Sequence, residues 1–137
     1  MDILTKARTL FASDRYATTL SGIEISAVGD HRAECRMQLG ADHCNARGVA
    51  MGGAIYTLAD FCAAVAANSE YIVGGDLQWV SLDATVHYLA PAPVNTTLKA
   101  TCVALKAGRT TALMQTTIES PDSGKCIAIV ETTMIKC

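Results

Sequence analysis

Residues 43–60 read HCNARGVAMGGAIYTLAD and continue as FCAAVAANS to residue 69. The first part is a polar loop interrupted by glycines, whereas the part from about Gly53 to Asn68 is a helix-forming run that is apolar on nearly every side. A helix of this kind must be buried all round or lie in a membrane. Between Arg47 and Glu70 the only side chain charged at neutral pH is Asp60. Since an isolated buried carboxylate is costly, Asp60 is the first candidate for a functional residue.

Length and composition narrow the class of protein. A chain of 137 residues is most simply one domain that buries roughly 70% of its unfolded surface. The net charge of -2 and the lack of a basic stripe argue against a nucleic-acid partner. No pair of the six cysteines has C-x-x-C spacing, so we expect no metal site, and reduced thiols in a cytoplasmic protein. The apolar helix is too short, and too interrupted by Asp60, to span a bilayer, so we expect no membrane partner.

The first half of the chain contains a short helix, two strands and the long apolar helix. Residues 2–10 place apolar side chains on one helical face, and Asp2 can cap that helix. Residues 17–27 are rich in β-branched side chains and predict a strand broken near Gly22. Residues 32–39 alternate apolar and polar side chains, which predicts a half-exposed strand paired to the previous one through a turn at residues 29–30.

The second half is β-rich. A long strand over residues 77–89 ends at Pro91 and Pro93. Three further strands are expected, and spacing and turn residues predict that all four form an antiparallel meander. The three later strands cover residues 96–106, 110–119 and 126–135. The fold class is therefore α+β, with one long buried helix against an antiparallel sheet of five or six strands. Such a sheet leaves a face or edges uncovered, so we expect self-association.

The loop and helix also carry a family resemblance. The run His43-x-Asn45-x-x-Gly48-x-x-Met51-Gly52-Gly53-x-x-x-x-Leu58-Ala59-Asp60 resembles the signature H-x-N-x-x-G-x-x-H-G-G-x-x-x-x-L-A-D. That signature is typical of PaaI-like hotdog-fold acyl-CoA thioesterases, of the 4-hydroxybenzoyl-CoA thioesterase superfamily. Residues 80–92 look like the family's third strand, and residues 106–110 look like its later hairpin. The resemblance therefore covers most of the chain after residue 40 as one domain, residues 1–137.

The resemblance implies a fold, an activity and an assembly. The fold is a sheet wrapped around one long central helix. The activity is hydrolysis of an acyl-CoA thioester to a free acid and coenzyme A, with no cofactor because coenzyme A is part of the substrate. The assembly is a homodimer, often paired into a homotetramer, whose active site is shared between two subunits.

Two features supply the main parts of a hydrolytic site. Burial strips water from the Asp60 carboxylate and improves it as a base, and by resemblance Asp60 is either general base or nucleophile. Gly52 and Gly53 leave N–H groups uncovered at a helix start, which suits a developing oxyanion, and by resemblance Gly52 is the principal donor. The structural alternatives are that Asp60 binds a loop or a buried tyrosine, and that the glycines serve only close packing.

Four further residues are candidates by resemblance. Asn45 would hold the carbonyl or the water, although an Asx-turn explains it equally well. Ser81 would orient the water, yet strand alternation places it opposite the helix-facing residues 82, 84, 86 and 88. Either a bulge near Ser81 or a second subunit is then required. His43 is the first residue of the motif, and the alternative for a lone histidine in a loop is a purely structural role. Met51 stands where the family has histidine, and it lacks a comparable hydrogen-bond donor.

The resemblance also suggests contacts for the coenzyme A end of the substrate, and two other functions are considered. Lys106 and Arg109 flank a hairpin turn and would contact phosphates by resemblance, or are ordinary solvated charges. One rival function is a hotdog hydratase or dehydratase, whose usual His–acid motifs are not found here. The other is a non-catalytic acyl-CoA-binding protein, motivated by Met51, which predicts saturable binding without hydrolysis.

Overall fold

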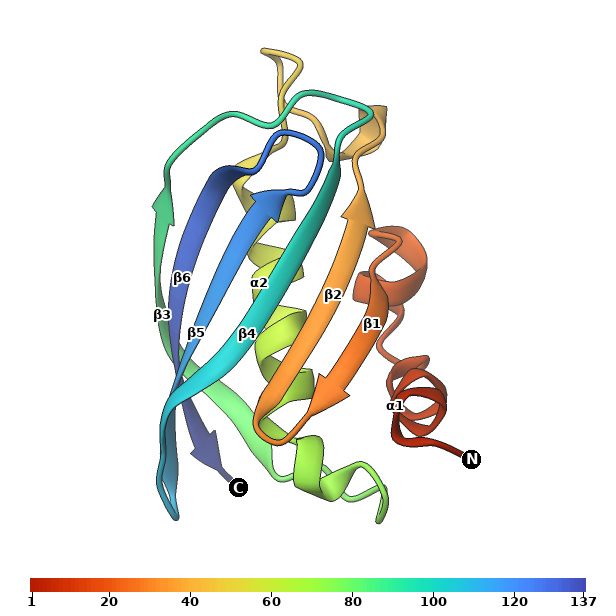
Figure 1. Ribbon diagram of the computed structural model, residues 1–137, viewed down its shortest axis with the longest axis vertical. Helices are drawn as coiled ribbons and strands as arrows, with labels where there is room; N and C mark the ends of the chain where they lie inside the picture. Colours follow the sequence, from red (N-terminus) through yellow and green to blue (C-terminus); the bar gives the residue numbers. More distant parts are fainter.

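Six antiparallel strands form one curved sheet around helix α2 (Gly52–Ala67) in the computed structural model, which describes residues 1–137 (Figure 1). The order of the strands in the sheet is β1-β2-β4-β5-β6-β3. The strands are β1 (Glu24–Gly29), β2 (Arg32–Gln38), β3 (Trp79–Tyr88), β4 (Thr97–Ala107), β5 (Thr111–Ser120) and β6 (Lys125–Lys136). Helix α1 (Ile3–Phe11) and short turns at Tyr16–Leu20, Ala41–His43 and Ser69–Tyr71 complete the chain. The predicted hotdog arrangement is confirmed.

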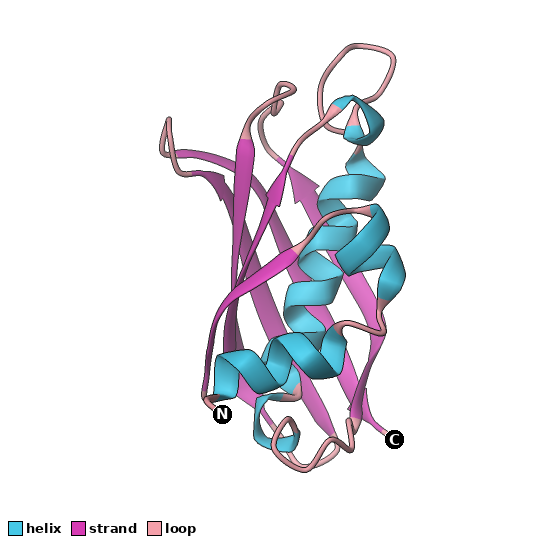
Figure 2. Cartoon of the chain, turned by 90° about the vertical axis from the view of Figure 1, so that its right-hand side faces the viewer, coloured by secondary structure: helices cyan, strands magenta, loops and turns pink.

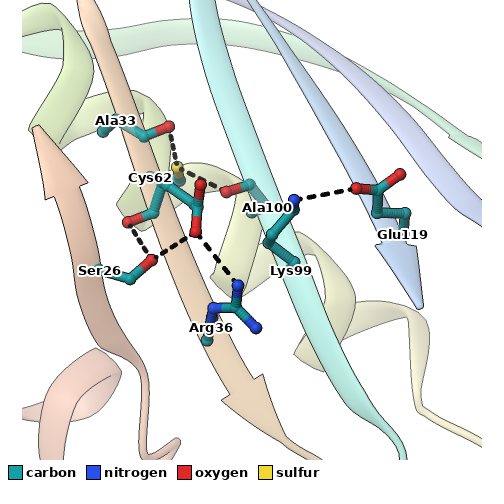
Figure 3. Close-up of polar contacts among 8 residues, drawn as sticks. Ser26, Ala33, Arg36, Cys62, Lys99, Ala100 and Glu119 are labelled. Atoms are coloured by element: carbon teal, nitrogen blue, oxygen red, sulfur yellow. Dashed lines mark hydrogen bonds and ion pairs between the residues drawn. The ribbon is translucent and has the colours of Figure 1, made fainter. Parts of the chain in front are cut away.

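The core lies between α2 and the concave face of the sheet. Helix α2 buries Leu58, Phe61, Val65 and their small neighbours, and its first turns keep a partly exposed side that includes Gly53 and Asp60. Its Cys62 thiol lies within 3.5 Å of the Ala33 carbonyl oxygen on β2 and 3.7 Å of the Ala100 carbonyl oxygen on β4 (Figure 3). Burial raises the pKa of Cys62, so this thiol is neutral and packs as a small apolar group, as predicted.

Small side chains and free thiols let the helix and sheet approach closely. Cys35 on β2 and Cys102 on β4 are fully buried beside Cys62, and none of the six cysteines forms a disulfide. Burial raises the pKa of Cys102 to about 12. On the opposite side of the sheet the side chains are polar, and the Lys99 ammonium lies 3.2 Å from the Glu119 carboxylate across β4 and β5 (Figure 3). The alternation along these strands therefore separates an apolar inner face from a polar outer one.

The start of the chain confirms one expectation and corrects another. Helix α1 forms as predicted, and the Asp2 carboxylate caps it by accepting the Thr5 N–H at 2.8 Å. The strand expected over residues 17–27 is wrong in its first part, because Tyr16–Leu20 is a helical turn and β1 begins only at Glu24. Burial of Ala17 against the core holds this turn despite its β-branched residues. We call this segment the Tyr16–Leu20 turn.

The expected four-strand meander is also wrong in one connection. Strands β4, β5 and β6 follow one another as hairpins, but β3 pairs with β6 at the far edge, and β4 pairs with β2 instead. The cause lies in residues 89–96, where Pro91 and Pro93 prevent a tight hairpin. That segment crosses the end of the sheet and carries the chain from one edge to the interior (Figure 1). Strand β3 is thereby left as an edge strand.

Asn68 joins the end of α2 to the start of β3. Its side-chain amide donates to the Ala64 carbonyl at 2.9 Å and to the Trp79 carbonyl at 3.1 Å. Its side-chain oxygen accepts the N–H groups of Gln78 and Trp79, each at 2.9 Å. Asn68 is only 1% exposed, so its full set of hydrogen bonds satisfies groups that water cannot reach.

No helix of the chain combines the length and the apolarity needed to cross a membrane.

Replacing Asn68 tests how much its hydrogen bonds contribute to the free energy of unfolding. We expect Asn68→Ala to lower the free energy of unfolding by about 3 kcal/mol, because several buried backbone groups lose their partner together. Urea denaturation measures the change. Gln78→Ala is the control, since that side chain bonds only to Asp76 and should cost under about 0.5 kcal/mol. An equal effect of the two variants would contradict the assigned role.

Candidate active site

Asp60 and Ser81 meet between the middle of α2 and the edge strand β3. The Ser81 hydroxyl donates to Oδ1 of Asp60 at 2.9 Å, and it also lies 3.5 Å from the Met134 sulfur. The contact brings together an acid and a serine that are 21 residues apart in the sequence. The two residues singled out from different motifs therefore share one site.

A β-bulge in β3 makes this contact compatible with the rest of the strand. Ser81 is opposite Met134 and Asp83 is opposite Thr133, so Leu82 is an extra residue without its own partner on β6. The extra residue reverses the alternation, and Ser81 then faces the same side as Ala84 and Val86. Of the two explanations left open by the sequence, the bulge is confirmed. The expectation that Leu82 packs on the helix is wrong, because Leu82 is 58% exposed.

Asp60 has hydroxyl-bearing neighbours, Ser81 and Tyr56, and no balancing cation. The carboxylate is half-buried, and no lysine, arginine or histidine forms an ion pair with it. Tyr56 lies one turn earlier on α2. Burial raises the pKa of Tyr56 above its ordinary 10.0, and the negative charge of Asp60 raises it further. The same pKa shift has a contribution from a side-chain hydrogen bond between Tyr56 and Asp60, so the tyrosine contact of the structural alternative is present beside the Ser81 contact. A carboxylate held by hydroxyl groups and without a cation is suited to accept a proton or attack a carbonyl.

The first turn of α2 forms the second part of the site. Met51 precedes the helix and provides no side-chain cap, and the N–H groups of Gly52 and Gly53 have no acceptor within the chain. These two N–H groups and the positive end of the helix dipole point outward. A carbonyl oxygen that gains negative charge would be stabilised at this position.

Tyr88, at the end of β3, covers one side of this helix start. Its hydroxyl donates to the Gly52 carbonyl at 2.9 Å. A Cβ atom on Gly52 would lie 3.1 Å from the tyrosine ring and hydroxyl, whereas at Gly53 nothing lies within 4 Å. A side chain at position 52 would therefore require Tyr88 to move by a few tenths of an ångström, whereas position 53 has open space. Sequence reasoning placed Tyr88 on the helix-facing side of its strand but gave no signal for this contact.

The loop before α2 contains Asn45 and His43, and both make the hydrogen bonds of their structural alternatives. The Asn45 side-chain oxygen accepts the Arg47 N–H at 2.9 Å, which forms an Asx-turn. His43 Nδ1 accepts the Gly40 N–H at 2.9 Å, and Nε2 lies 2.7 Å from the Ser21 carbonyl oxygen. Because Nδ1 is an acceptor, the ring proton resides on Nε2 and is donated to Ser21. His43 thus ties the loop to the segment ahead of β1.

The remaining candidates lie at opposite ends of the molecule. Met51 is 52% exposed and lies beside Gly53 at the start of α2. Lys106 and Arg109 are exposed in the β4–β5 hairpin. That hairpin is near the other end of α2, since the Lys136 N–H bonds the Thr110 carbonyl and Lys136 pairs with Trp79. Within one chain, the structure does not bring these two cations to Gly52.

Distance also separates Asp60 from the Gly52 N–H. The two residues are eight positions apart on the same helix, which is about 12 Å along the axis at a rise of about 1.5 Å per residue. A single carbonyl carbon needs a donor and an attacking atom within about 3 Å. One chain therefore cannot offer both groups to the same thioester.

Comparison with known proteins gives a family and a set of related structures. The model of the thioesterase superfamily matches residues 47–127. The chain is 29% identical to human acyl-coenzyme A thioesterase 13 over 126 residues, which are 91% of this chain and 83% of that protein, and it matches the Pongo abelii protein equally.

Two solved structures extend the comparison. The fold is similar to that of zebrafish thioesterase superfamily member 2, with a TM-score of 0.80, 25% identity and coverage of 98% of this chain and 94% of that chain. It is also similar to the Escherichia coli PaaI protein of the phenylacetic acid degradation operon, with a TM-score of 0.84, 23% identity and coverage of 99% and 96%. The match to PaaI supports the fold.

The pKa of Tyr56 reports directly on Asp60. Asp60→Asn should lower the pKa of Tyr56 part of the way toward 10.0, because the charge is lost while burial remains. Titrating phenolate absorbance measures the shift, and Tyr56→Phe identifies the relevant transition. The raised pKa also means that stability is fully present below about pH 10 and falls as the pH rises through the folded-state value. An unchanged Tyr56 titration in Asp60→Asn would show that the acid is not charged beside this ring.

Proposed function

The chain belongs to the thioesterase superfamily and hydrolyses acyl-coenzyme A thioesters, and we propose that Asp60, Ser81 and Gly52 carry the reaction. The observation that carries this proposal is the 2.9 Å hydrogen bond from Ser81 to Asp60, the one charged residue of the buried helix. The products are the free acid and coenzyme A.

The carboxylate admits two routes. As a general base, Asp60 accepts a proton from a water molecule while the water oxygen bonds to the thioester carbon. As a nucleophile, Asp60 bonds to that carbon itself, and the resulting anhydride is then cleaved by water. In both routes the carbon–sulfur bond breaks, the thiolate leaves, and a proton from the attacking water is available for the sulfur. The Ser81 hydroxyl fixes the orientation of the carboxylate in either case.

Gly52 stabilises the charge that forms on the carbonyl oxygen. Its N–H is unpaired, it lies at the positive end of α2, and Tyr88 holds the adjacent backbone from the other side. Donors that are fixed before reaction lower the barrier because they need no reorganisation. Asn45 assists in this proposal through its side-chain N–H groups, since only its oxygen is used by the Asx-turn.

The active site is shared between two copies of the chain in this proposal. The separation of about 12 Å between Asp60 and Gly52 along α2 requires that a partner subunit supply one of them. Strand β3 is an edge strand, and it presents exposed apolar side chains that a partner would cover. They are Val80, Leu82 and Tyr88, and Leu89 follows directly after the strand. We propose a homodimer built on this edge, with dimers pairing into a tetramer.

Lys106 and Arg109 are the proposed contacts for the phosphates of coenzyme A. Lys106 and Arg109 could reach the phosphates of coenzyme A only if another subunit presents them, because in their own chain they lie at the far end of α2. Their exposure and lack of ion pairs leave them free for that role.

The six free cysteines favour a cytoplasmic location.

Substitutions at two positions, Asp60 and Gly52, test the assigned chemistry. Asp60→Asn should lower kcat by about 100-fold or more on an acyl-CoA panel, measured by thiol release. Gly52→Pro removes the proposed donor while suiting the first position of a helix, and it should cost about 100-fold more in kcat than Gly52→Ala, which keeps the N–H. The exposed Asp76→Asn is the control for an acid-to-amide change. Wild-type turnover by Asp60→Asn, or equal rates for the two Gly52 variants, would contradict these roles.

Mixing the two inactive variants tests the shared site. In a heterodimer of Asp60→Asn and Gly52→Pro, one of the two sites contains only unaltered residues. Random reassembly after reversible unfolding should therefore restore about a quarter of the wild-type activity. Remixing each variant with itself is the control. No recovery in a mixture shown to contain heterodimers would mean that each chain acts alone.

A further inference from the structure

Tyr56 lies midway along α2 between the two parts of the proposed site. Gly52 is four residues before it and Asp60 four residues after it, so each lies about 6 Å away along the helix axis. Residues four apart share a side of a helix. All three residues are half-buried. The helix therefore presents Gly52, Tyr56 and Asp60 together, on a side that its own chain does not fully cover.

The two flanks of this part of α2 differ in what covers them. On one flank, α1 and the Tyr16–Leu20 turn lie in front of the helix in Figure 2, on the side of β1. On the other flank lies the edge strand β3, whose Ser81 and Tyr88 bond to residues 60 and 52. No further element of the chain lies beyond β3 (Figure 1). A second copy of the chain therefore reaches Tyr56 from the β3 side.

Tyr56 also belongs to a row of polar groups. Burial raises its pKa, and the charge of Asp60, a hydrogen bond to that carboxylate and the nearby Tyr88 raise it further. The phenol is therefore neutral at physiological pH and donates to Asp60. Oδ1 of Asp60 also accepts from Ser81 at 2.9 Å, and Tyr88 donates to the Gly52 carbonyl at 2.9 Å. A movement of Tyr56 is thus transmitted directly to the carboxylate.

Two-fold symmetry brings residue 56 of the two copies together. In the proposed dimer Asp60 of each chain serves the Gly52 N–H of the other, and the symmetry axis exchanges the two pairs. On a straight helix, residue 56 is the midpoint between residues 52 and 60. The line between the two midpoints is then the average of the two lines that join Asp60 to the partner subunit's Gly52. Since symmetry makes those two lines equal in length, the helices are no farther apart at residue 56 than at the active sites.

A tyrosine suits this position. Helices that pack side by side have axes about 8–10 Å apart, and two aromatic rings with centroids about 4.5–7 Å apart fit between them. The chain has four tyrosines, and position 56 is one of the unspecified positions of the family signature. The ring at this position is therefore a property of this chain that the signature does not require.

We propose that Tyr56 contacts Tyr56 of the partner subunit at the two-fold axis, and that this tyrosine pair holds each Asp60 opposite the partner subunit's Gly52. This inference rests on the proposed function and identifies the residue at the centre of its shared site. Tyr56 acts through Asp60, so it is a positioning residue rather than a catalytic one. Its ring sets the spacing of the two helices, and its hydroxyl orients the carboxylate. Because the pair lies between both active sites, a change at residue 56 affects the two sites equally.

Paired charges at residue 56 test the contact. Tyr56→Glu and Tyr56→Lys each bring like charges together at the axis, so each variant alone should dimerise at least about tenfold more weakly than wild type. An equimolar mixture brings opposite charges together and should form heterodimers at least about tenfold more tightly than either homodimer. Analytical ultracentrifugation measures the dissociation constants, and circular dichroism checks that the variants fold. Val73→Glu and Val73→Lys, at an exposed position, should behave like wild type alone and mixed. Equal affinities for the mixture and the separate variants would show that residue 56 does not meet itself.

An oxidative cross-link tests the same contact in the unaltered protein. Persulfate, activated by light and a ruthenium complex, removes one electron and one proton from each of two adjacent tyrosine rings, and a carbon–carbon bond then joins the rings. The expected product is a covalent dimer in which residue 56 is joined to residue 56, as identified by mass spectrometry of its peptides. Tyr56→Phe should abolish this product and Tyr71→Phe should keep it. Absence of the 56–56 link from a protein shown to be dimeric would overturn the inference.

Steady-state kinetics test the positioning role. Tyr56→Phe keeps the ring, and therefore the dimer, but removes the hydroxyl beside Asp60. We expect kcat on acyl-CoA to fall by about tenfold with KM unchanged, whereas a purely structural role would leave kcat as in wild type. An unchanged kcat overturns the positioning role. If Asp60→Asn also keeps wild-type turnover, the proposed function fails, while the contact at the axis still depends only on the two dimer measurements.

Discussion

The side chain of Asn68 fixes the position of β3 relative to α2, and the rest of the site depends on it. It is hydrogen-bonded on one side to the last turn of the helix and on the other to the backbone of Trp79. Asp60 lies eight residues before this joint and Ser81 two residues after Trp79. Because helix and strand each have a fixed rise per residue, the joint sets how far along the helix the serine arrives. Because of the bulge at Leu82, the later side chains Ala84 and Val86 face the same side of the strand as Ser81.

Much of the fold could be predicted from the sequence because single patterns determined it. The all-round apolar run over residues 53–68 had to be a central helix, and strict alternation marked residues 32–39 as a half-exposed strand. One prediction failed where a tertiary contact outweighed local preference, since the Tyr16–Leu20 turn is helical because Ala17 is buried. The other failed because pairing partners were assigned in chain order, although two prolines after β3 prevent a hairpin and β3 pairs with β6. The role of Asn68 could not be predicted, since its partners lie across a loop.

The candidate site was predictable to a similar degree. Asp60 was identified because a lone charge in an apolar helix requires an explanation, and the partnership with Ser81 is a finding of the structure that sequence alternation alone opposed. Tyr88 gave no signal, because its role consists of contact with the backbone of a distant glycine. Met51, the departure from the family pattern, has no donor to replace histidine, but it adds apolar surface beside the helix start.

The bulge in β3 also affects how the protein meets other copies of itself. An exposed edge strand of ten residues with apolar side chains is a template onto which further strands can add without limit. A bulge increases local twist and interrupts the regular spacing of backbone groups. The edge can then fit one shaped partner but not an open-ended stack of strands. The extra residue that directs Ser81 toward Asp60 thus also belongs to the features by which proteins limit pairing at a sheet edge.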